Sequence, residues 1–127
     1  MKETVYVRKK IKGVLEDTLK DYEAKNREIH ILKAHFKINV AYIIIPFSQL
    51  SEAMQKNRYG WGGVYLTYPN AQGVTILSRV GLNSAKNQAL VYVNNTIDSD
   101  HYEMTYFLLS REGNGWLIQT KQKTWNY

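Results

Sequence analysis

The chain contains no cysteine among its 127 residues. It therefore has no disulfide scaffold, no zinc–thiolate or iron–sulfur ligands and no thiol nucleophile. Long hydrophobic runs are also lacking. The longest, Val40 to Phe47, is far shorter than the ~20 apolar residues that span a bilayer. The sequence predicts no membrane insertion.

Catalytic signatures are missing as well. The sequence has no Gly-x-Gly-x-x-Gly, no phosphate loop ending in Gly-Lys-Ser or Gly-Lys-Thr, no His-Glu-x-x-His and no Gly-x-Ser-x-Gly. We therefore assign no catalytic residue, metal site or cofactor, and a non-enzymatic domain is favoured over an enzyme.

The N-terminal segment lacks the apolar centre of a signal peptide, because charges run through Met1 to Lys12. The expected location is the cytoplasm, or outside it after removal of a signal peptide. Basic residues are concentrated in this region: Lys2 to Lys37 holds ten basic and six acidic residues, a net charge of +4 out of +6 for the chain. Clustered cations attract phosphates, so Arg8, Lys9, Lys10 and Lys12 are candidate nucleic-acid contacts. A solvated helix face is the favoured interpretation, because acidic residues soon follow.

The composition is that of a globular protein, with 44% hydrophobic and 22% charged residues. At this length we expect one domain covering residues 1–127. Aromatic residues make up 13% of the chain and include ten tyrosines. Flat amphipathic rings suit pleated, half-buried surfaces, so this composition favours a sheet-rich domain.

The N-terminal third has helical periodicity. Its apolar residues recur at spacings of three and four: Val7, Ile11, Val14, Leu15, Leu19 and Tyr22. This pattern predicts a long helix, clearest from Lys12 to Lys25, that stops at Asn26. An alternating segment then predicts a strand from Phe36 to Ile45, ended by Pro46. Ser48 or Ser51 is the expected N-cap of a short helix that runs to Asn57 with Leu50 and Met54 on one face.

The remainder has the pattern of strands separated by turns. The expected strands are Trp61–Tyr68, Val74–Leu82, Gln88–Asn94, Tyr102–Arg111 and Trp116–Trp125. Short turns between them predict an antiparallel meander of four to six strands, covered by the long helix. The class is α+β, with a cystatin-like or nuclear-transport-factor-like outline as an analogy of architecture. The glycines of Gly60–Gly63 would precede a strand, so they offer no helix N-terminus for phosphate.

The histidines do not form a recognisable site. His30 and His35 are five residues apart, a spacing that suits neither one helix face nor one strand face. His101 lies near Asp98 and Asp100, where ordinary turn chemistry is favoured over loose cation binding. A Ser-His-Asp system built from Ser78 and His101 carries little weight, because any chain of this length allows such a selection.

Arg79 is unusual because it interrupts an apolar segment predicted to be a strand, on the same face as Thr75, Leu77 and Gly81. Such a guanidinium pairs with a carboxylate, extends to an edge of the sheet, or faces a cavity and binds an anion. Structural pairing, for example with Glu103, is favoured over ligand binding. Aromatic residues could line that cavity or stack on bases, although core packing is favoured. They are Trp61, Tyr65, Tyr68, Tyr92, Tyr102, Tyr106 and Trp125.

Several short motifs in the C-terminal two-thirds occur in a characteristic order: Gly60-Trp61, Tyr68-Pro69, Ser78-Arg79-Val80-Gly81-Leu82-Asn83, Ala89-Leu90-Val91-Tyr92, Gly115-Trp116 and a final Trp125. Over Lys33 to Trp125 the chain resembles a family of small uncharacterised bacterial proteins. Leu82 replaces that family's usual Phe, and Asn94 to Asp100 lacks the glycines common in its loop. The resemblance implies kinship but no reaction, and it marks Trp61, Tyr68, Arg79, Asn83, Tyr92 and Trp125 as candidate ligand-binding residues.

Three functions follow from these patterns. The favoured one is a binding or protein-interaction domain without catalytic activity. The alternatives are a small-ligand or enzymatic domain with a pocket around Arg79 and tyrosines, and a nucleic-acid-binding domain that uses the basic N-terminal residues.

Overall fold

The computed structural model describes residues 11–28, 41–56 and 60–126. These residues form an α+β fold with an open antiparallel sheet, as the sequence predicts. The helices are α2 (Glu16–Lys25), α3 (Phe47–Gln55) and α4 (Trp61–Thr67). The strands are β1 (Val74–Leu77), β2 (Gly81–Leu82), β3 (Gln88–Asp98), β4 (His101–Glu112) and β5 (Gly115–Asn126).

Contacts divide the chain into two compact units. Unit 1 comprises residues 1–29 and 73–127 and contains α2 and the sheet, whereas unit 2 comprises residues 30–72 and contains α3 and α4. One domain over residues 1–127 stays a prediction, as does the cystatin-like or nuclear-transport-factor-like outline.

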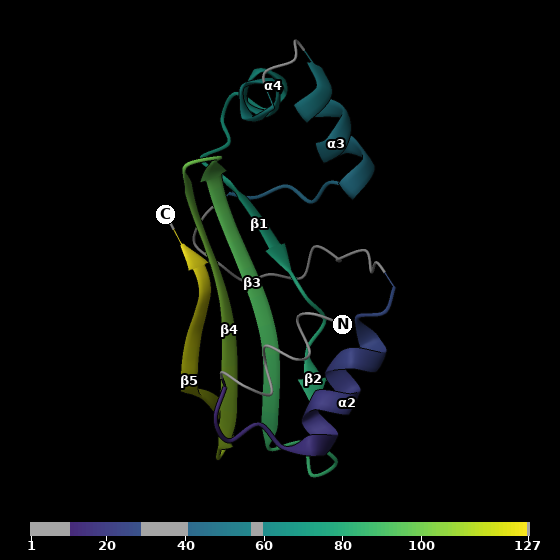
Figure 1. The fold of residues 1–127 in the computed structure, drawn as a ribbon, viewed down its shortest axis with the longest axis vertical. Helices are drawn as coiled ribbons and strands as arrows, with labels where there is room; N and C mark the ends of the chain where they lie inside the picture. The colour runs from purple at the N-terminus through teal and green to yellow at the C-terminus, as the bar shows by residue number, and fades with distance from the viewer. Residues whose placement is uncertain (1–10, 29–40, 57–59, 127) are drawn as a thin grey trace. The chain divides into compact units, whose positions relative to one another are not determined.

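The sheet has the order β1-β3-β4-β5, and the short strand β2 also pairs with β3 (Figure 1). Every pairing is antiparallel. The turns after β3 and β4 are each two residues long, and Gly113 adopts the positive φ of +60° that the second turn requires. The predicted strand Val74–Leu82 is divided, because residues 78–80 are not in a strand. The two long hairpins confirm the predicted meander.

One face of the sheet packs against α2. Leu90 lies opposite Leu108, and Tyr92 lies opposite Tyr106, so these four side chains share a face. They form the core with residues from the N-terminal segment, namely Ile11, Val14, Leu19 and Tyr22. The Tyr106 ring contacts Tyr92 at 5.0 Å and Tyr22 edge-on at 6.1 Å between centroids. The aromatic residues at the centre of this unit are therefore packing residues.

The long N-terminal helix is not confirmed. α2 begins at Glu16 instead of Lys12, because Gly13 has a φ of +87° and Leu15 is extended, and neither conformation continues a helix. The end agrees with the prediction: Lys25 is the last helical residue and Asn26 is the C-cap. The segment before Ile11, with Val7, lies outside the described residues.

In unit 2 the predicted short helix is present as α3, with Leu50 buried and Met54 partly buried. Its N-cap residue is Pro46, so the predicted caps Ser48 and Ser51 are wrong, and both lie inside the helix. Residues 41–46 are not in a strand. The rest of the predicted strand, Phe36 to Val40, lies outside the described residues. Alternation alone does not make a strand, because its backbone groups need a partner strand.

The predicted strand Trp61–Tyr68 is wrong, since residues 61–67 form helix α4. Gly63 explains why. A Cβ at Gly63 would overlap the carbonyl oxygen of Ala53 in α3 and lie 2.9 Å from that of Lys56. The missing side chain thus lets two helices approach closely, and this packing outweighs the β propensity of Val64 and Tyr65. The expectation that Gly60–Gly63 precedes a strand is wrong for the same reason, because these glycines lie at the start of a helix. At seven residues, α4 is too short for us to assign it an anion site.

Candidate functional site

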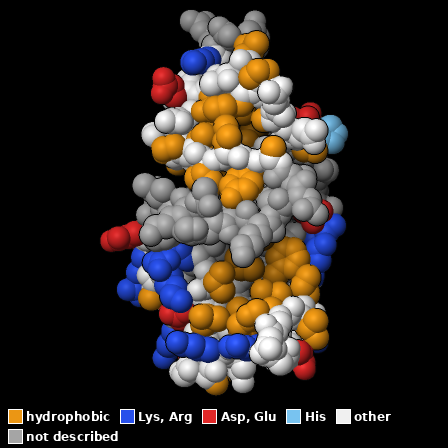
Figure 2. All heavy atoms as spheres, turned by 180° about the vertical axis from the view of Figure 1, so that it is seen from behind, with side chains coloured by type: hydrophobic (Ala, Val, Ile, Leu, Met, Phe, Trp, Pro, Cys, Tyr) orange, Lys and Arg blue, Asp and Glu red, His pale blue; other side chains and the backbone are white. Residues whose placement is uncertain are grey.

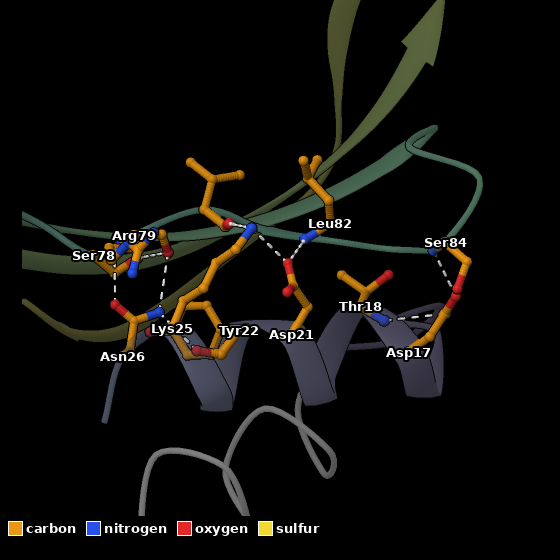
Figure 3. A network of polar contacts seen from close by, with 11 residues as sticks. Asp17, Thr18, Asp21, Tyr22, Lys25, Asn26, Ser78, Arg79, Leu82 and Ser84 are labelled. Carbon is orange, nitrogen blue, oxygen red and sulfur yellow. Dashed lines mark hydrogen bonds and ion pairs between the residues drawn. The ribbon is translucent and has the colours of Figure 1, made fainter. Parts of the chain in front are cut away.

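The two ends of the sheet differ in how their backbone groups are used. At the β2 end, side chains of α2 bind the backbone (Figure 3). Asp21 accepts a hydrogen bond from the Leu82 amide at 2.8 Å, and Asp17 accepts one from the Ser84 amide at 2.7 Å. Lys25 donates to the Val80 carbonyl at 3.1 Å. Because Asp17, Asp21 and Lys25 follow at intervals of four, one face of α2 binds the backbone of β2 and of the residues beside it.

The same contacts set the charge state of α2. Burial raises the pKa of Asp21, but hydrogen bonds from Lys25 and the Leu82 amide, with the nearby charges of Lys25 and Arg79, hold it below its ordinary value. Hydrogen bonds from Ser84 lower the pKa of Asp17. Both carboxylates are therefore stabilised as acceptors, and the edge at β2 is closed by structural interactions.

Arg79 belongs to this closed edge. Its backbone amide donates to Asn26 Oδ1 at 2.8 Å, and its carbonyl accepts from Asn26 Nδ2 at 3.1 Å. The side chain is exposed and lies outside β1 and β2, so its predicted position within a strand is wrong. The predicted partner Glu103 instead pairs with Lys123 at 3.3 Å and Lys121 at 4.0 Å. Asn26 thus holds the backbone of the connection between β1 and β2, which lies outside both strands.

The other candidate ligand-binding residues are spread over both units. Asn83 is buried and holds the β2–β3 turn, accepting from the Asn87 and Gln88 amides at 2.9 and 2.8 Å. Tyr92 packs on Tyr106 in the core. Trp61 is in α4 and Tyr68 is its C-cap, both in unit 2. Trp125 is in β5, where its backbone pairs with Met104. Asn83 and Tyr92 thus have clear structural roles.

The candidate nucleic-acid residues cannot be placed together. Arg8, Lys9 and Lys10 lie outside the described residues, and Lys12 is exposed. His30 and His35 also lie outside them. His101 contacts Asp98 at 2.8 Å, and the same carboxylate oxygen accepts a hydrogen bond from the Asp100 amide. These contacts lie within the β3–β4 turn, as expected for a polar turn. The hydrogen bond from His101 lowers the pKa of Asp98.

Neither a metal site nor a Ser-His-Asp arrangement is found in the part of the chain that the structure describes. No three His, Asp or Glu side chains gather there into a metal-binding group. The Ser78 amide bonds to Tyr92, whereas His101 pairs with Asp98, six residues further along β3. That separation is about 20 Å at the rise of a strand. The Ser78 hydroxyl instead donates to Arg79 O and accepts the Tyr92 amide.

Strand β5, at the other end of the sheet, carries a surface that we call the β5 patch: Trp116, Ile118, Lys121 and Lys123, with Phe107 of β4. Ile118 lies opposite Leu109, Lys121 opposite Phe107 and Lys123 opposite Thr105, so these side chains share the sheet face away from α2. Trp116 and Ile118 are 40% and 59% exposed. Seen from behind, hydrophobic side chains gather over unit 1 between basic ones (Figure 2).

The patch has a basic half and an apolar half. The Lys121 ammonium lies 5.8 Å from the centre of the Phe107 ring, within reach of a cation–π contact. Glu103 is the only carboxylate with which the two lysines form an ion pair among the described residues. Its pKa is lowered chiefly by the hydrogen bond from Lys123. Glu103 therefore holds both lysines beside the Phe107 ring in this half of the patch.

Comparison of the chain with protein-family models, with curated proteins and with solved structures gives no match. The resemblance to a bacterial family therefore stays a prediction. Among the described helices, none is both long and apolar enough to cross a membrane. The candidate site consequently rests on the geometry of the sheet alone.

The β5 patch is not among the sites that the sequence predicts. Its strand was predicted, and the run Trp116-Leu117-Ile118 is visible in the sequence, but an apolar run in a strand ordinarily indicates burial. All three side chains are exposed, at 40%, 58% and 59%. The missing information was the strand order, which places this run at the end of the sheet.

Proposed function

We propose that the chain is a protein-interaction domain without catalytic activity and that it binds its partner through the β5 patch. The observation that carries the proposal is the exposure of Trp116 and Ile118 on one face of the last strand of the sheet. Exposed apolar groups rimmed by charge are characteristic of protein-binding surfaces. Tryptophan in particular contributes large contact areas to interfaces.

A pocket around Arg79 has less support. Its guanidinium is exposed, and its backbone is held by Asn26. The nearby tyrosines Tyr22, Tyr92 and Tyr106 contact one another in the core. Membership of the family of small uncharacterised bacterial proteins is part of this proposal, supported by the ordered motifs from Gly60-Trp61 to Trp125.

The proposal is tested by selecting binders from a random peptide library displayed on phage, with the purified chain as the target. Binding of the enriched peptides is then measured for the double variant Trp116→Thr/Ile118→Thr. Removing two apolar side chains from an interface costs ~1.5–3 kcal/mol each when they are fully buried by the partner. Because burial by a peptide is partial, we expect a loss of affinity of about tenfold or more.

Ile97→Thr is the matched control, because Ile97 is 55% exposed in β3 and undergoes the same chemical change away from the patch. It should leave the affinity unchanged. Circular dichroism and proton NMR spectra establish that all variants are folded. Equal peptide binding by the double variant, or the absence of any enriched peptide, would refute the proposal.

A further inference from the structure

The outer edge of β5 offers backbone groups in addition to the patch. β5 is 12 residues long and is the last strand in the sheet order, with β4 on one side. Within residues 11–28, 41–56 and 60–126 no strand pairs with its other side. On the opposite edge, α2 binds the backbone of β2 and of the residues beside it. An unpaired strand edge is a template for an added strand.

From this edge and its charges we propose that the partner segment is an extended acidic peptide that adds a strand to β5. The inference rests on the proposed function and names the class of its partner. Main-chain hydrogen bonds to β5 would supply the pairing, while carboxylates of the peptide would face Lys121 and Lys123. Its apolar side chains would cover Trp116 and Ile118.

Charge complementarity selects an acidic partner. The segment Gly115–Asn126 contains two lysines and no acidic residue, and the whole chain carries +6. Lysines on an edge strand oppose pairing with a second positively charged copy. The same two lysines, which both contact the carboxylate of Glu103, would attract the carboxylates of a peptide. A second copy of this chain brings no carboxylate on its own β5 and is the less suitable occupant.

The pattern along β5 predicts the sequence of the peptide. The register shift between Leu108 and Leu109 of β4 leaves an extra residue on β5 near Gln119, which keeps Ile118 and Lys121 on one face although they are three apart. An antiparallel peptide that follows this face meets Lys123, Lys121, Ile118 and Trp116 at every second residue. The probe is therefore a capped Glu-Thr-Glu-Thr-Val-Thr-Val-Thr peptide.

Binding of the fluorescently labelled probe to the full chain is measured by anisotropy at 50 and 300 mM salt. We expect saturable binding that weakens at high salt, because exposed charges are screened. Lys121→Gln/Lys123→Gln should weaken it about three- to tenfold, the sum of two surface ion pairs. Lys20→Gln/Lys56→Gln removes the same charge from exposed positions elsewhere and should have a smaller effect.

Strand addition is distinguished from mere charge attraction by N-methylation. Two further probes carry methyl groups on alternate amides, one on the odd and one on the even residues, so that each loses the hydrogen-bond donors of only one edge. We expect one methylated probe to bind as the parent does and the other to lose binding. Equal behaviour of the two probes would overturn the proposal, because a strand pairs through one edge only.

The remaining outcomes separate this inference from the proposed function. If the acidic probe fails while library-selected peptides still depend on Trp116 and Ile118, the function stands and the acidic-strand inference is wrong. If sedimentation shows a dimer that Lys121→Gln/Lys123→Gln strengthens, the occupant is a second copy and the inference is also wrong. If neither the probe nor any library peptide binds, both proposals fail.

Discussion

Gln88 connects the start of β3 to the first turn of α2 and to the residues that precede this helix. Its side-chain oxygen accepts hydrogen bonds from the Leu15 amide at 2.9 Å and the Thr18 hydroxyl at 2.8 Å. Its side-chain nitrogen donates to the Gly13 carbonyl at 2.8 Å. Leu15 is the N-cap residue of α2 and has no side chain that can cap the helix. A residue more than 70 positions away therefore supplies the polar contacts that a local cap ordinarily provides.

Gln88→Leu should destabilise the protein strongly. The substitution removes three hydrogen bonds from a side chain that is only 7% exposed and leaves polar groups near α2 unpaired. Unsatisfied buried groups cost ~1–3 kcal/mol each, so we expect a loss of about 2–3 kcal/mol in the free energy of unfolding. Urea denaturation followed by circular dichroism measures it. Gln49→Leu changes an exposed glutamine of α3 and should stay within about 0.5 kcal/mol of the original chain; equal effects would contradict the assigned role.

Arg79 and Asn26 show what a residue type alone does not reveal. The guanidinium suggested an ion pair or a ligand contact, yet the structure uses the backbone of Arg79. Asn26 was predicted only as the end of a helix. Its side-chain amide in fact donates to Arg79 O and accepts from Arg79 N, as a neighbouring strand would. Such contacts depend on tertiary placement, so neither sequence position indicates them.

At the scale of elements, Gly63 in α4 gives a sharp test. A Cβ there would meet the backbone oxygens of Ala53 and Lys56, which cannot move without disturbing the end of α3. Overpacking of this kind costs ~1–3 kcal/mol. Gly63→Ala should therefore lower the helical circular dichroism signal and speed amide hydrogen exchange in α3 and α4, while the amides of β3 and β4 remain protected.

The control is Gly62→Ala, which changes the neighbouring exposed glycine of the same helix. Alanine has the higher helix propensity by up to ~1 kcal/mol, so an exposed position should be neutral or stabilised. If Gly63→Ala exchanges no faster than Gly62→Ala, close packing of α3 on α4 is not what holds this helix.

The elements differ in how far the sequence could predict them. The β3–β4–β5 hairpins were predicted because their signals are local: alternating strands with Asp98–His101 and Glu112–Gly115 as turns. α4 was not predicted, because its aromatic and β-branched residues favour a strand. The helix depends on the close approach of Gly63 to α3, which the local sequence does not indicate. The β5 patch was missed for a similar reason, since strand order is a property of the whole sheet.

At the scale of the molecule, electrostatics makes unit 1 sensitive to acid. Among the residues that the structure describes, it lowers the pKa of four carboxyl groups, those of Asp17, Asp21, Asp98 and Glu103, and all four lie in this unit. A folded-state pKa below the unfolded one means that the unfolded chain binds more protons as the pH falls. Stability is then fully present above the unfolded pKa and decreases as the pH falls through the folded pKa. Two of these groups fix the edge at β2, whereas Glu103 lies beside the β5 patch.

Asp21→Asn tests this coupling between charge and fold. Asp21 bonds to the Leu82 amide and to Lys25, but its side chain is 33% exposed, so solvent screening reduces the gain. We expect the variant to lose about 0.5–1 kcal/mol in the free energy of unfolding at pH 7. The ordinary pKa is near 3.8, so the difference from the original chain should shrink between about pH 4 and pH 2, where the native carboxylate also becomes protonated. Urea denaturation at pH 7, 4 and 2.5 measures it, with Asp100→Asn in the β3–β4 turn as the control. If the difference in the free energy of unfolding between the two chains grows towards low pH, it has the wrong sign for a stabilised carboxylate. Asp21 would then not stabilise the contact between α2 and β2 through its charge.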